Sequence, residues 1–317
     1  MADSNRRPTY EGRPLARPGA EIVDQGLGFD LGTMLDRRRL LRAFGLGATA
    51  LGLAAACDDG SGAGPSGAAS APAAGDGAAS APASAGGAAA GEIPDETAGP
   101  YPGDGSNGPD VLTDSGIVRA DIRSSFGTAA GAAEGVPMTL ELRIVDLAAG
   151  GAPFAGVAVY VWHCDREGRY SLYSPGVTDQ NYLRGVQLAD GTGTVKFTSV
   201  FPGCYAGRWP HVHFEVYPDR AGLTDATKAI ATSQVALPKD ACDAVYARSG
   251  YSASVRNLAG VTLQSDNVFG DDGGALQLGT VTGDADRGYT VSLTARVDTR
   301  TAPTGGLGGP GGAPPGR

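Results

Sequence analysis

Alternation of apolar and polar residues is the feature that most limits how this chain can fold. Leu140, Leu142 and Ile144 are separated by polar residues, and the same period of two recurs at residues 157–161 and 289–297. Successive side chains of a β-strand point to opposite faces, so each run predicts a strand with one buried face. Gly, Pro and Asp separate the runs. The sequence therefore predicts an all-β fold, an antiparallel β-sandwich with long loops, with a short helix at residues 238–247.

Composition divides the 317 residues into segments of different kinds. Residues 58–91 are almost entirely Gly, Ala, Ser and Pro, and residues 301–317 form a similar Gly/Pro tail. Such segments cannot bury enough apolar surface to offset the entropy of ordering them, so we interpret them as a linker and a disordered tail. Residues 92–300 remain as one domain of about 210 residues, a size that suits a single core.

Residues 1–57 predict an N-terminal extension followed by an export signal. Three arginines at residues 37–39 precede an apolar run rich in Gly, Ala and Leu at residues 43–56. This order is typical of a twin-arginine (Tat) signal, and it predicts a periplasmic or other extracytoplasmic location. The alternative, a transmembrane helix, needs roughly 20 apolar residues, more than this run contains. The sequence leaves open whether translation starts at Met1 or Met34.

The cysteines concern two features of the chain: attachment to a membrane and disulfide formation. Cys57 ends the apolar run in a Leu-Ala-Ala-Ala-Cys sequence that resembles a lipoprotein processing site, and its lipidation would tether the protein to a membrane. Ordinary cleavage nearby is the alternative. Cys164, Cys204 and Cys242 remain; an oxidising compartment permits one disulfide among them, and we favour Cys204 with Cys242 while all three pairings stay open.

The charge of the chain argues against one class of partner. The formal net charge is −9, and residues 1–56 contribute +2, so the remainder carries −11. A nucleic-acid-binding surface needs a basic stripe, which the sequence lacks. We therefore expect no nucleic-acid partner, and the sequence leaves the oligomeric state open.

A histidine pair marks the candidate site. Two of the three histidines, His211 and His213, fall two residues apart in a strand predicted at residues 211–217. Residues two apart share one face of a strand, so both imidazoles can bind one ion. The third, His163, follows a strand end and is interpreted as structural.

Two tyrosines complete the candidate donor set. Tyr205 lies six residues before His211 in a Pro- and Gly-flanked turn, and Tyr170 follows a Gly-containing turn after a strand. Phenolate and imidazole ligands suit a ferric ion, whereas zinc sites draw on Cys, His and Glu. A trivalent cation would also hold a phenolate deprotonated at neutral pH.

These segments resemble those of the intradiol ring-cleavage dioxygenases, the catechol and protocatechuate dioxygenase family. The resemblance covers roughly residues 95–298. It rests on Gly168-Arg-Tyr170-Ser, Pro202-Gly-Cys-Tyr205, Arg208-x-x-His211-x-His213-Phe, Thr97-Ala-Gly-Pro-Tyr101 and Thr232-Ser-Gln234. The well-studied enzymes have Pro directly after the arginine, where this chain has Trp209.

The resemblance implies a β-sandwich with one non-haem Fe(III) per chain, which cleaves an aromatic 1,2-diol with O₂ between the hydroxyl-bearing carbons to give a cis,cis-muconate-type diacid. It implies Tyr170 and His211 as equatorial ligands, and Tyr205 and His213 as axial ligands. Tyr205, Arg208 and Gln234 would take part in catalysis. The implied substrate-binding residues are Thr97, Ala98, Gly99, Pro100, Tyr101 and Trp209.

Two other functions compete with this one. The chain could be a non-catalytic, transthyretin-like module that binds iron or an aromatic ligand, or a surface adhesion or scaffold domain. The presence of both Tyr205 and Arg208 favours the enzyme.

Among the remaining polar residues, we expect Glu215 to point to water, and Arg184 and Gln187 either to orient a loop or to face solvent.

Overall fold

The computed structural model describes residues 91–304, together with residues 9–10 and 13–14. The predicted signal, Cys57, the linker and most of the tail lie outside the described residues. Contacts divide the chain into units of residues 1–87 and 88–317. In the first unit, Thr9–Tyr10 (β1) and Arg13–Pro14 (β2) pair as a short antiparallel ladder. The described part of the chain contains no helix with the length and apolarity to cross a membrane.

One sheet of the second unit has five strands. They are Pro137–Asp146 (β3), Ala152–Pro153 (β4), Thr194–Val200 (β7), Thr280–Asp284 (β10) and Gly288–Val297 (β11). The order runs β10, β11, β3, and the far edge of β3 pairs with β7 along most of its length and with β4 at its end. The β3–β11 pair is parallel, unlike the predicted antiparallel pairing. These strands lie far apart in the sequence, so no hairpin dictates their direction.

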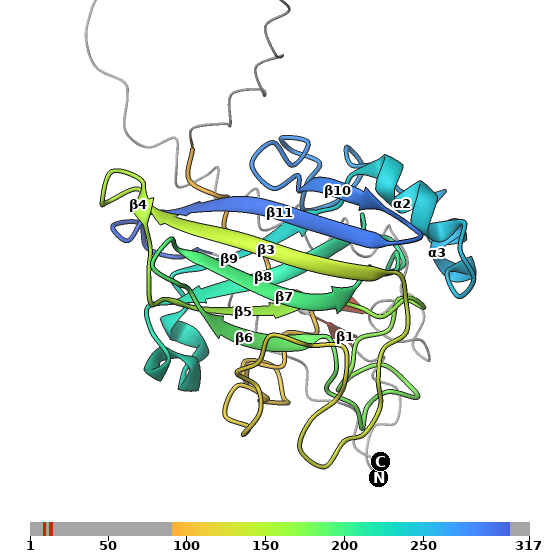
Figure 1. Ribbon diagram of the computed structural model, residues 1–317, viewed down its shortest axis with the longest axis horizontal. Helices are drawn as coiled ribbons and strands as arrows, with labels where there is room; N and C mark the ends of the chain where they lie inside the picture. The colour runs from red at the N-terminus through yellow and green to blue at the C-terminus, as the bar shows by residue number, and fades with distance from the viewer. Residues whose placement is uncertain (1–8, 11–12, 15–90, 305–317) are drawn as a thin grey trace, which may run out of the picture. The chain divides into compact units, whose positions relative to one another are not determined.

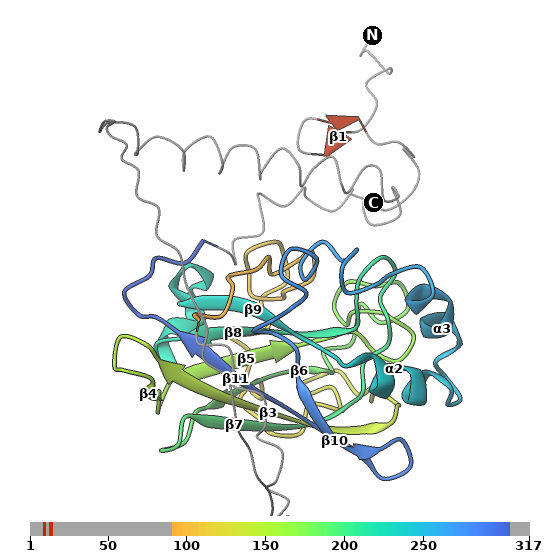
Figure 2. The same ribbon diagram turned by 90° about the horizontal axis from the view of Figure 1, so that it is seen from above.

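The other sheet has four strands and is antiparallel throughout. The strands are Ala158–Trp162 (β5), Arg184–Leu188 (β6), His211–Tyr217 (β8) and Ala231–Ala236 (β9), in the order β6, β5, β8, β9. Figures 1 and 2 show the two sheets stacked as layers of a sandwich. The prediction of an all-β sandwich is confirmed.

Short helices fill the connections. The 3-10 turns Ala221–Thr224 (η2) and Ala226–Lys228 (η3) link β8 to β9, and the helices Lys239–Tyr246 (α2) and Ser252–Leu258 (α3) follow β9. Helix α2 confirms the helix predicted at residues 238–247.

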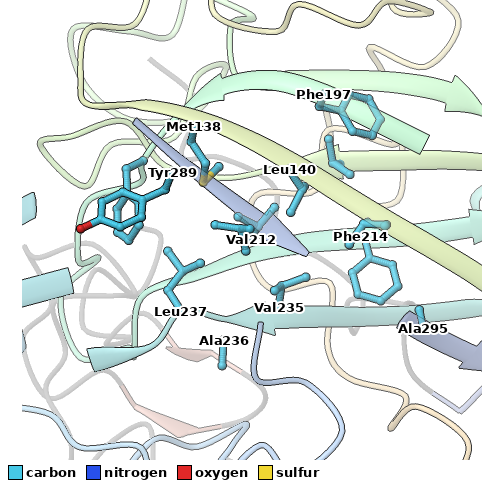
Figure 3. Packing of buried hydrophobic residues seen from close by; sticks show 14 of the residues in the cluster. Met138, Leu140, Phe197, Val212, Phe214, Val235, Ala236, Leu237, Tyr289 and Ala295 are labelled. Carbon is cyan, nitrogen blue, oxygen red and sulfur yellow. The ribbon is translucent and has the colours of Figure 1, made fainter. Parts of the chain in front are cut away.

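The main core lies between the two sheets. Leu140 of β3 packs beside Val212 and Phe214 of β8, and all three side chains are fully buried (Figure 3). Burying each large apolar side chain stabilises the fold by roughly 1.5–3 kcal/mol. The apolar half of each alternating run therefore forms the sandwich interior.

The four-stranded sheet is buried on its second face as well. A second apolar cluster includes Tyr160 and Trp162 of β5 and Tyr217 of β8, and it packs under loop residues such as Val111 and Ile117. Every residue of β5, β8 and β9 is consequently buried. Polar side chains on this second face lie away from water, where unpaired groups are costly and electrostatic interactions are strong.

Candidate functional site

A small cavity of about 20 Å³ opens over the second face of the four-stranded sheet. All four residues of the donor set that we predicted from the sequence line it. The lining residues are Pro100, Tyr101, Tyr170, Tyr205, Arg208, His211 and His213.

Strand β8 brings the two imidazoles together. His211 and His213 occupy alternate positions of β8, and their Nε2 atoms are 2.9 Å apart. The His211 Nδ1–H donates to the carbonyl oxygen of Trp209 at 2.5 Å, which leaves the Nε2 lone pair directed into the cavity. His213 stacks on Trp162 at 4.8 Å between ring centroids, nearly parallel at 7°. Gly99 is a further neighbour of His213: a Cβ at position 99 would lie 3.4 Å from His213 Cε1.

Tyr170 reaches the same point from the turn that follows β5. Gly168 adopts φ +84° in this turn and packs against the backbone of Cys204 and Tyr205, so the two tyrosine segments meet there. The Tyr170 hydroxyl lies 3.3 Å from His211 Nε2. The side chain is 2% exposed.

Tyr205 closes the other side of the cavity. Its ring lies edge-on to that of Tyr170, with 5.7 Å between centroids. The hydroxyl oxygens of Tyr205 and Tyr101 are 3.5 Å apart. The phenol groups therefore meet at the cavity, although Tyr101, Tyr170 and Tyr205 come from segments that lie far apart in the sequence.

Burial controls the protonation of these groups. It lowers the pKa of His211 to about 3, with the neighbouring Arg208 acting in the same direction, and it lowers the pKa of His213 well below its usual value. It raises the pKa of Tyr170 well above the ordinary value for a phenol. Both imidazoles are therefore neutral and able to coordinate, while a phenolate here requires a cation to offset its burial.

The donor chemistry fits a ferric ion. Two nitrogen ligands at about 2.0–2.1 Å from one ion and at right angles would be roughly 2.9 Å apart, as the two Nε2 atoms are. Within the described residues, no cluster of three or more His, Cys, Asp or Glu side chains could hold a metal ion. The predicted set takes its two oxygen donors from Tyr170 and Tyr205, which line the cavity. Phenolates with imidazoles favour a hard trivalent cation.

Arg208 is held by two partners beside the cavity. Its Nε donates to Asp266 Oδ2 at 3.0 Å, and its Nη2 donates to Gln234 Oε1 at 2.7 Å. Gln234 Nε2 in turn donates to the carbonyl of Thr97 at 3.1 Å. Two of the three predicted catalytic residues, Arg208 and Gln234, therefore form one hydrogen-bonded chain with the segment predicted to bind substrate.

Asp266 is a site residue that sequence reasoning missed. Besides Arg208, it accepts hydrogen bonds from the backbone N–H groups of Trp209, Val268 and Phe269. Burial alone would raise its pKa, but Arg208 and these hydrogen bonds lower the pKa overall. The loop around residue 266 carries no alternation or motif that could have identified it.

Arg184 is the second buried cation of this region, and it orients a loop, which is one of the two roles considered from the sequence. It is 1% exposed and donates to the carbonyls of Tyr101, Pro102 and Ser171 and to the hydroxyl of Tyr160, at 2.7–2.9 Å. It also donates to the Ser171 hydroxyl at 3.1 Å. Arg184 thereby fixes the backbone beside Tyr101 and Tyr170.

The segment predicted to bind substrate lies at the cavity, with one exception. Pro100 and Tyr101 line the cavity, Gly99 packs on His213, Thr97 bonds Gln234 and Ala98 is fully buried beneath them. Trp209, by contrast, is not among the lining residues. It packs in the main core, and its indole N–H donates to the carbonyl of Leu237 at 2.9 Å.

Two further expectations, for Glu215 and His163, can be compared with the structure. Glu215 does not point to water: it is 1% exposed and accepts from the Tyr217 hydroxyl at 2.8 Å, because loops cover this face of the sheet. His163 lies away from the cavity with its Nε2 2.7 Å from the Ser199 hydroxyl.

The expected disulfide is absent among the described residues. Cys164, Cys204 and Cys242 are all free and buried, so the Cys204–Cys242 pairing is not formed. Burial raises the pKa of the Cys204 thiol to about 12, which keeps it protonated and unreactive.

Comparison with known proteins agrees with this geometry. The Dioxygenase_C family model, described as dioxygenase, matches residues 108–221, which include all four predicted ligands. The chlorocatechol 1,2-dioxygenase of Rhodococcus opacus is 38% identical over 55 residues, which are 17% of this chain and 21% of that protein. The catechol 1,2-dioxygenase of Pseudomonas sp. (strain EST1001) is 36% identical over 72 residues, 23% of each. The matches thus span about a fifth of the length of these curated relatives.

The fold has a counterpart among solved structures. An intradiol ring-cleavage dioxygenase from Tetranychus urticae superposes with a TM-score of 0.53 at 20% identity, over 68% of this chain and 98% of that one. The likeness at this identity concerns the fold. The family match and the sequence relatives agree with the resemblance of this chain to the intradiol ring-cleavage dioxygenases.

Proposed function

We propose that this chain is a non-haem Fe(III) dioxygenase that opens an aromatic 1,2-diol between its two hydroxyl-bearing carbons. Both atoms of O₂ enter the product, a cis,cis-muconate-type diacid. The single observation that carries the proposal is the convergence of Tyr170, Tyr205, His211 and His213 on one cavity. We propose one iron ion per chain, held by these four side chains.

When bound, Fe(III) supplies a Lewis acid that binds the diol oxygens and draws charge from the ring. The Tyr205 Oη is the proposed acceptor of a proton from one diol hydroxyl, and the Tyr101 hydroxyl 3.5 Å away can share that proton. Tyr205 is the more exposed of the two predicted tyrosine ligands, since it is half-buried where Tyr170 is buried. It is therefore the phenol that can move aside for a substrate.

Arg208 is the proposed stabiliser of negative charge on the activated ring. Its guanidinium lines the cavity and is fixed by Asp266 and Gln234, so it needs no reorganisation during the reaction. Pro100 and Tyr101 line the cavity beside it, and Tyr170, His211 and His213 are buried. Substrate and arginine are thus held in a site of low dielectric.

The first test measures the iron content and the visible absorption of the protein. The full chain loaded with iron should contain about one iron per chain and absorb in the visible region through charge transfer from phenolate to iron, and a diol should shift this absorption under anaerobic conditions. Oxygen uptake with catechol, in equal amount to diacid formed, would establish the activity. A coloured protein that binds catechol without consuming oxygen would instead be the non-catalytic binding module.

Tyr205→Phe tests the proton acceptor. We expect a loss of turnover of about 10²-fold, the usual size of a general-base contribution, with iron still bound. Tyr246→Phe is the matched control, because its hydroxyl donates to the carbonyl of Pro202 in the main core. Wild-type turnover in the Tyr205 variant would contradict the assigned role.

We further propose that the chain is exported by the Tat route and tethered through a lipidated Cys57. The support is the order of segments in the sequence: arginines, apolar run, cysteine and a segment rich in Gly, Ala, Ser and Pro. Cell fractionation and the mass of the mature N-terminus test both parts of this proposal. A mature chain that retains residues 1–56 would contradict them.

A further inference from the structure

One buried carboxylate joins two segments of the chain beside the cavity. Asp266 lies between α3 and β10, and its side chain is fully buried. Its Oδ2 accepts from Arg208 Nε at 3.0 Å and from the backbone N–H of Trp209 at 2.6 Å. Its Oδ1 accepts from the backbone N–H groups of Val268 at 2.8 Å and Phe269 at 3.1 Å. Each oxygen of this carboxylate therefore binds donors of a different segment.

The bond to Trp209 leads on to a predicted metal ligand. The carbonyl oxygen of Trp209 accepts from His211 Nδ1–H at 2.5 Å, and the next residue, Pro210, has no N–H of its own. Asp266 thus holds the backbone of Trp209 at its N–H, and the same residue holds the imidazole at its carbonyl. Because the imidazole is rigid, any turn of this carbonyl also changes the direction of the Nε2 lone pair.

A second path runs from Asp266 to the same imidazole. The N–H of Phe269 is bound by Asp266 Oδ1, and the phenyl ring lies 6.4 Å from the ring of His211 between centroids, at 64°. This edge-to-face arrangement is one that aromatic pairs prefer, and Phe269 is fully buried. Asp266 therefore acts on His211 both through its hydrogen bond and through its packing.

The same carboxylate also determines where the charge of Arg208 lies. Asp266 binds Arg208 at Nε, while Gln234 Oε1 binds its Nη2 at 2.7 Å. A planar guanidinium held at two of its nitrogens cannot rotate. Without Asp266, the guanidinium would keep the Gln234 contact alone and would rotate about it.

We propose that Asp266 is a positioning residue that holds the charge of Arg208 and the imidazole of His211 in one fixed arrangement around the bound diol. Asp266 is not among the residues that line the cavity, so it acts through Arg208, Trp209 and Phe269. The inference rests on the proposed function for the reaction that this arrangement serves. The hydrogen bonds themselves can be tested without iron and without substrate.

The first experiment measures the Asp266→Asn variant of the iron-free full chain by NMR. Asparagine has the same shape, but its amide N–H₂ faces N–H donors whichever way it is turned. We measure the exchange of the imidazole Nδ1–H protons with solvent. His163 is the control in the same spectrum, because its Nδ1–H donates to the carbonyl of Cys164 at 2.8 Å, away from Asp266. We expect exchange at His211 to be at least about tenfold faster than in the wild type, and exchange at His163 to stay within about twofold.

The second experiment measures the iron-loaded full chain. We expect Asp266→Asn to lower kcat by about 10- to 100-fold, because the charge of Arg208 is needed where charge develops on the ring. The anaerobic affinity for catechol should stay within about threefold, since the interaction is made in the transition state. Asp272→Asn is the matched control: Asp272 is exposed in the same connection and accepts from the N–H of Gly274 at 2.7 Å. It should change neither quantity.

The outcomes separate positioning from stability and from the proposed function. Equal acceleration of exchange at His163 and His211 would show that Asp266 only stabilises the fold, and it would overturn the inference. Wild-type exchange at His211, or a wild-type kcat, would overturn it as well. If exchange is accelerated at His211 alone but the wild type consumes no oxygen, the hold on the imidazole is upheld and the proposed activity fails.

A measurement on the wild type replaces the variant if Asp266→Asn does not fold. Hydrogen exchange of the Trp209 N–H and the His211 Nδ1–H is followed in the iron-free full chain at rising urea concentration. Because one group holds the other, both protons should exchange through the same opening, with the same dependence on urea. Exchange at His211 while the Trp209 N–H stays protected would overturn the inference.

Discussion

The two faces of the four-stranded sheet differ in what they contribute. On β8, Val212 and Phe214 point into the interior between the sheets, whereas His211 and His213 point to the opposite face and line the cavity. Both faces are equally buried, so exposure does not distinguish them. The difference lies in the partners: one face packs on apolar side chains, and the other meets loops that bring tyrosines and arginines. Stability and chemistry are therefore carried by alternate residues of one strand.

The largest effect should follow from removing a predicted iron ligand from the face of the sheet that lines the cavity. In His211→Ala, loss of one of two imidazole donors should abolish stoichiometric iron binding and lower turnover by at least about 10³-fold, roughly 4 kcal/mol. The iron-free protein should lose about 1–3 kcal/mol of stability, because the Trp209 carbonyl loses its hydrogen-bond donor. Metal analysis and calorimetry measure the two effects. Full iron content in this variant would show that the two faces do not divide their roles as proposed.

The matching change on the apolar face is Phe214→Ala. Removing a fully buried phenyl ring should lower the free energy of unfolding by about 3–5 kcal/mol, as measured in urea, while the folded fraction still binds iron. Leu188→Ala is the control on the same sheet, since Leu188 is 44% exposed, and it should cost less than about 1 kcal/mol. If Phe214→Ala lost iron affinity without losing stability, the apolar face would serve the metal site rather than stability, contrary to the roles given to the two faces.

A smaller effect is expected at Arg184, which joins the sheet to the loops. Arg184→Met leaves the carbonyls of Tyr101, Pro102 and Ser171 without their donor, and it should lower the free energy of unfolding by about 2–3 kcal/mol and weaken iron binding as well. Arg184→Lys should restore part of both. The exposed ion-pair variant Arg123→Met should cost under about 1 kcal/mol. If Arg184→Met lost stability but kept its full iron affinity, Arg184 would have no role in placing Tyr101 and Tyr170.

The smallest effect concerns one methyl group. Gly99→Ala and Gly156→Ala both place a Cβ at positive φ, +73° and +82°, which should cost about 1–2 kcal/mol in either variant. Only the Gly99 variant meets a side chain of the site, His213 Cε1 at 3.4 Å, whereas Gly156 has open space. We therefore expect the visible spectrum to shift in Gly99→Ala alone. Identical spectra would indicate that Gly99 does not position the imidazole.

Much of the candidate site could be predicted because its chemistry is local in the sequence. His211 and His213 are two residues apart in a strand, and Arg208 and Tyr205 lie in the turn just before it. A period of two and a short turn limit where such side chains can point. The residues missed have no such link: Asp266 comes from a loop 58 residues after Arg208, and its role arises only where the two segments meet.

The alternating pattern by itself determined the sandwich and the direction of each side chain on β8, because the period of a strand is a property of the backbone. Tertiary structure alone decided the environment of the polar face. Loops from residues 97–126 cover that face, which turned the expected solvent-facing Glu215 into a buried group and gave Arg184 two of its five acceptors, the carbonyls of Tyr101 and Pro102. The reason is physical: a strand pattern fixes which residues share a face, but the dielectric and the partners on that face depend on chain segments that no local periodicity specifies.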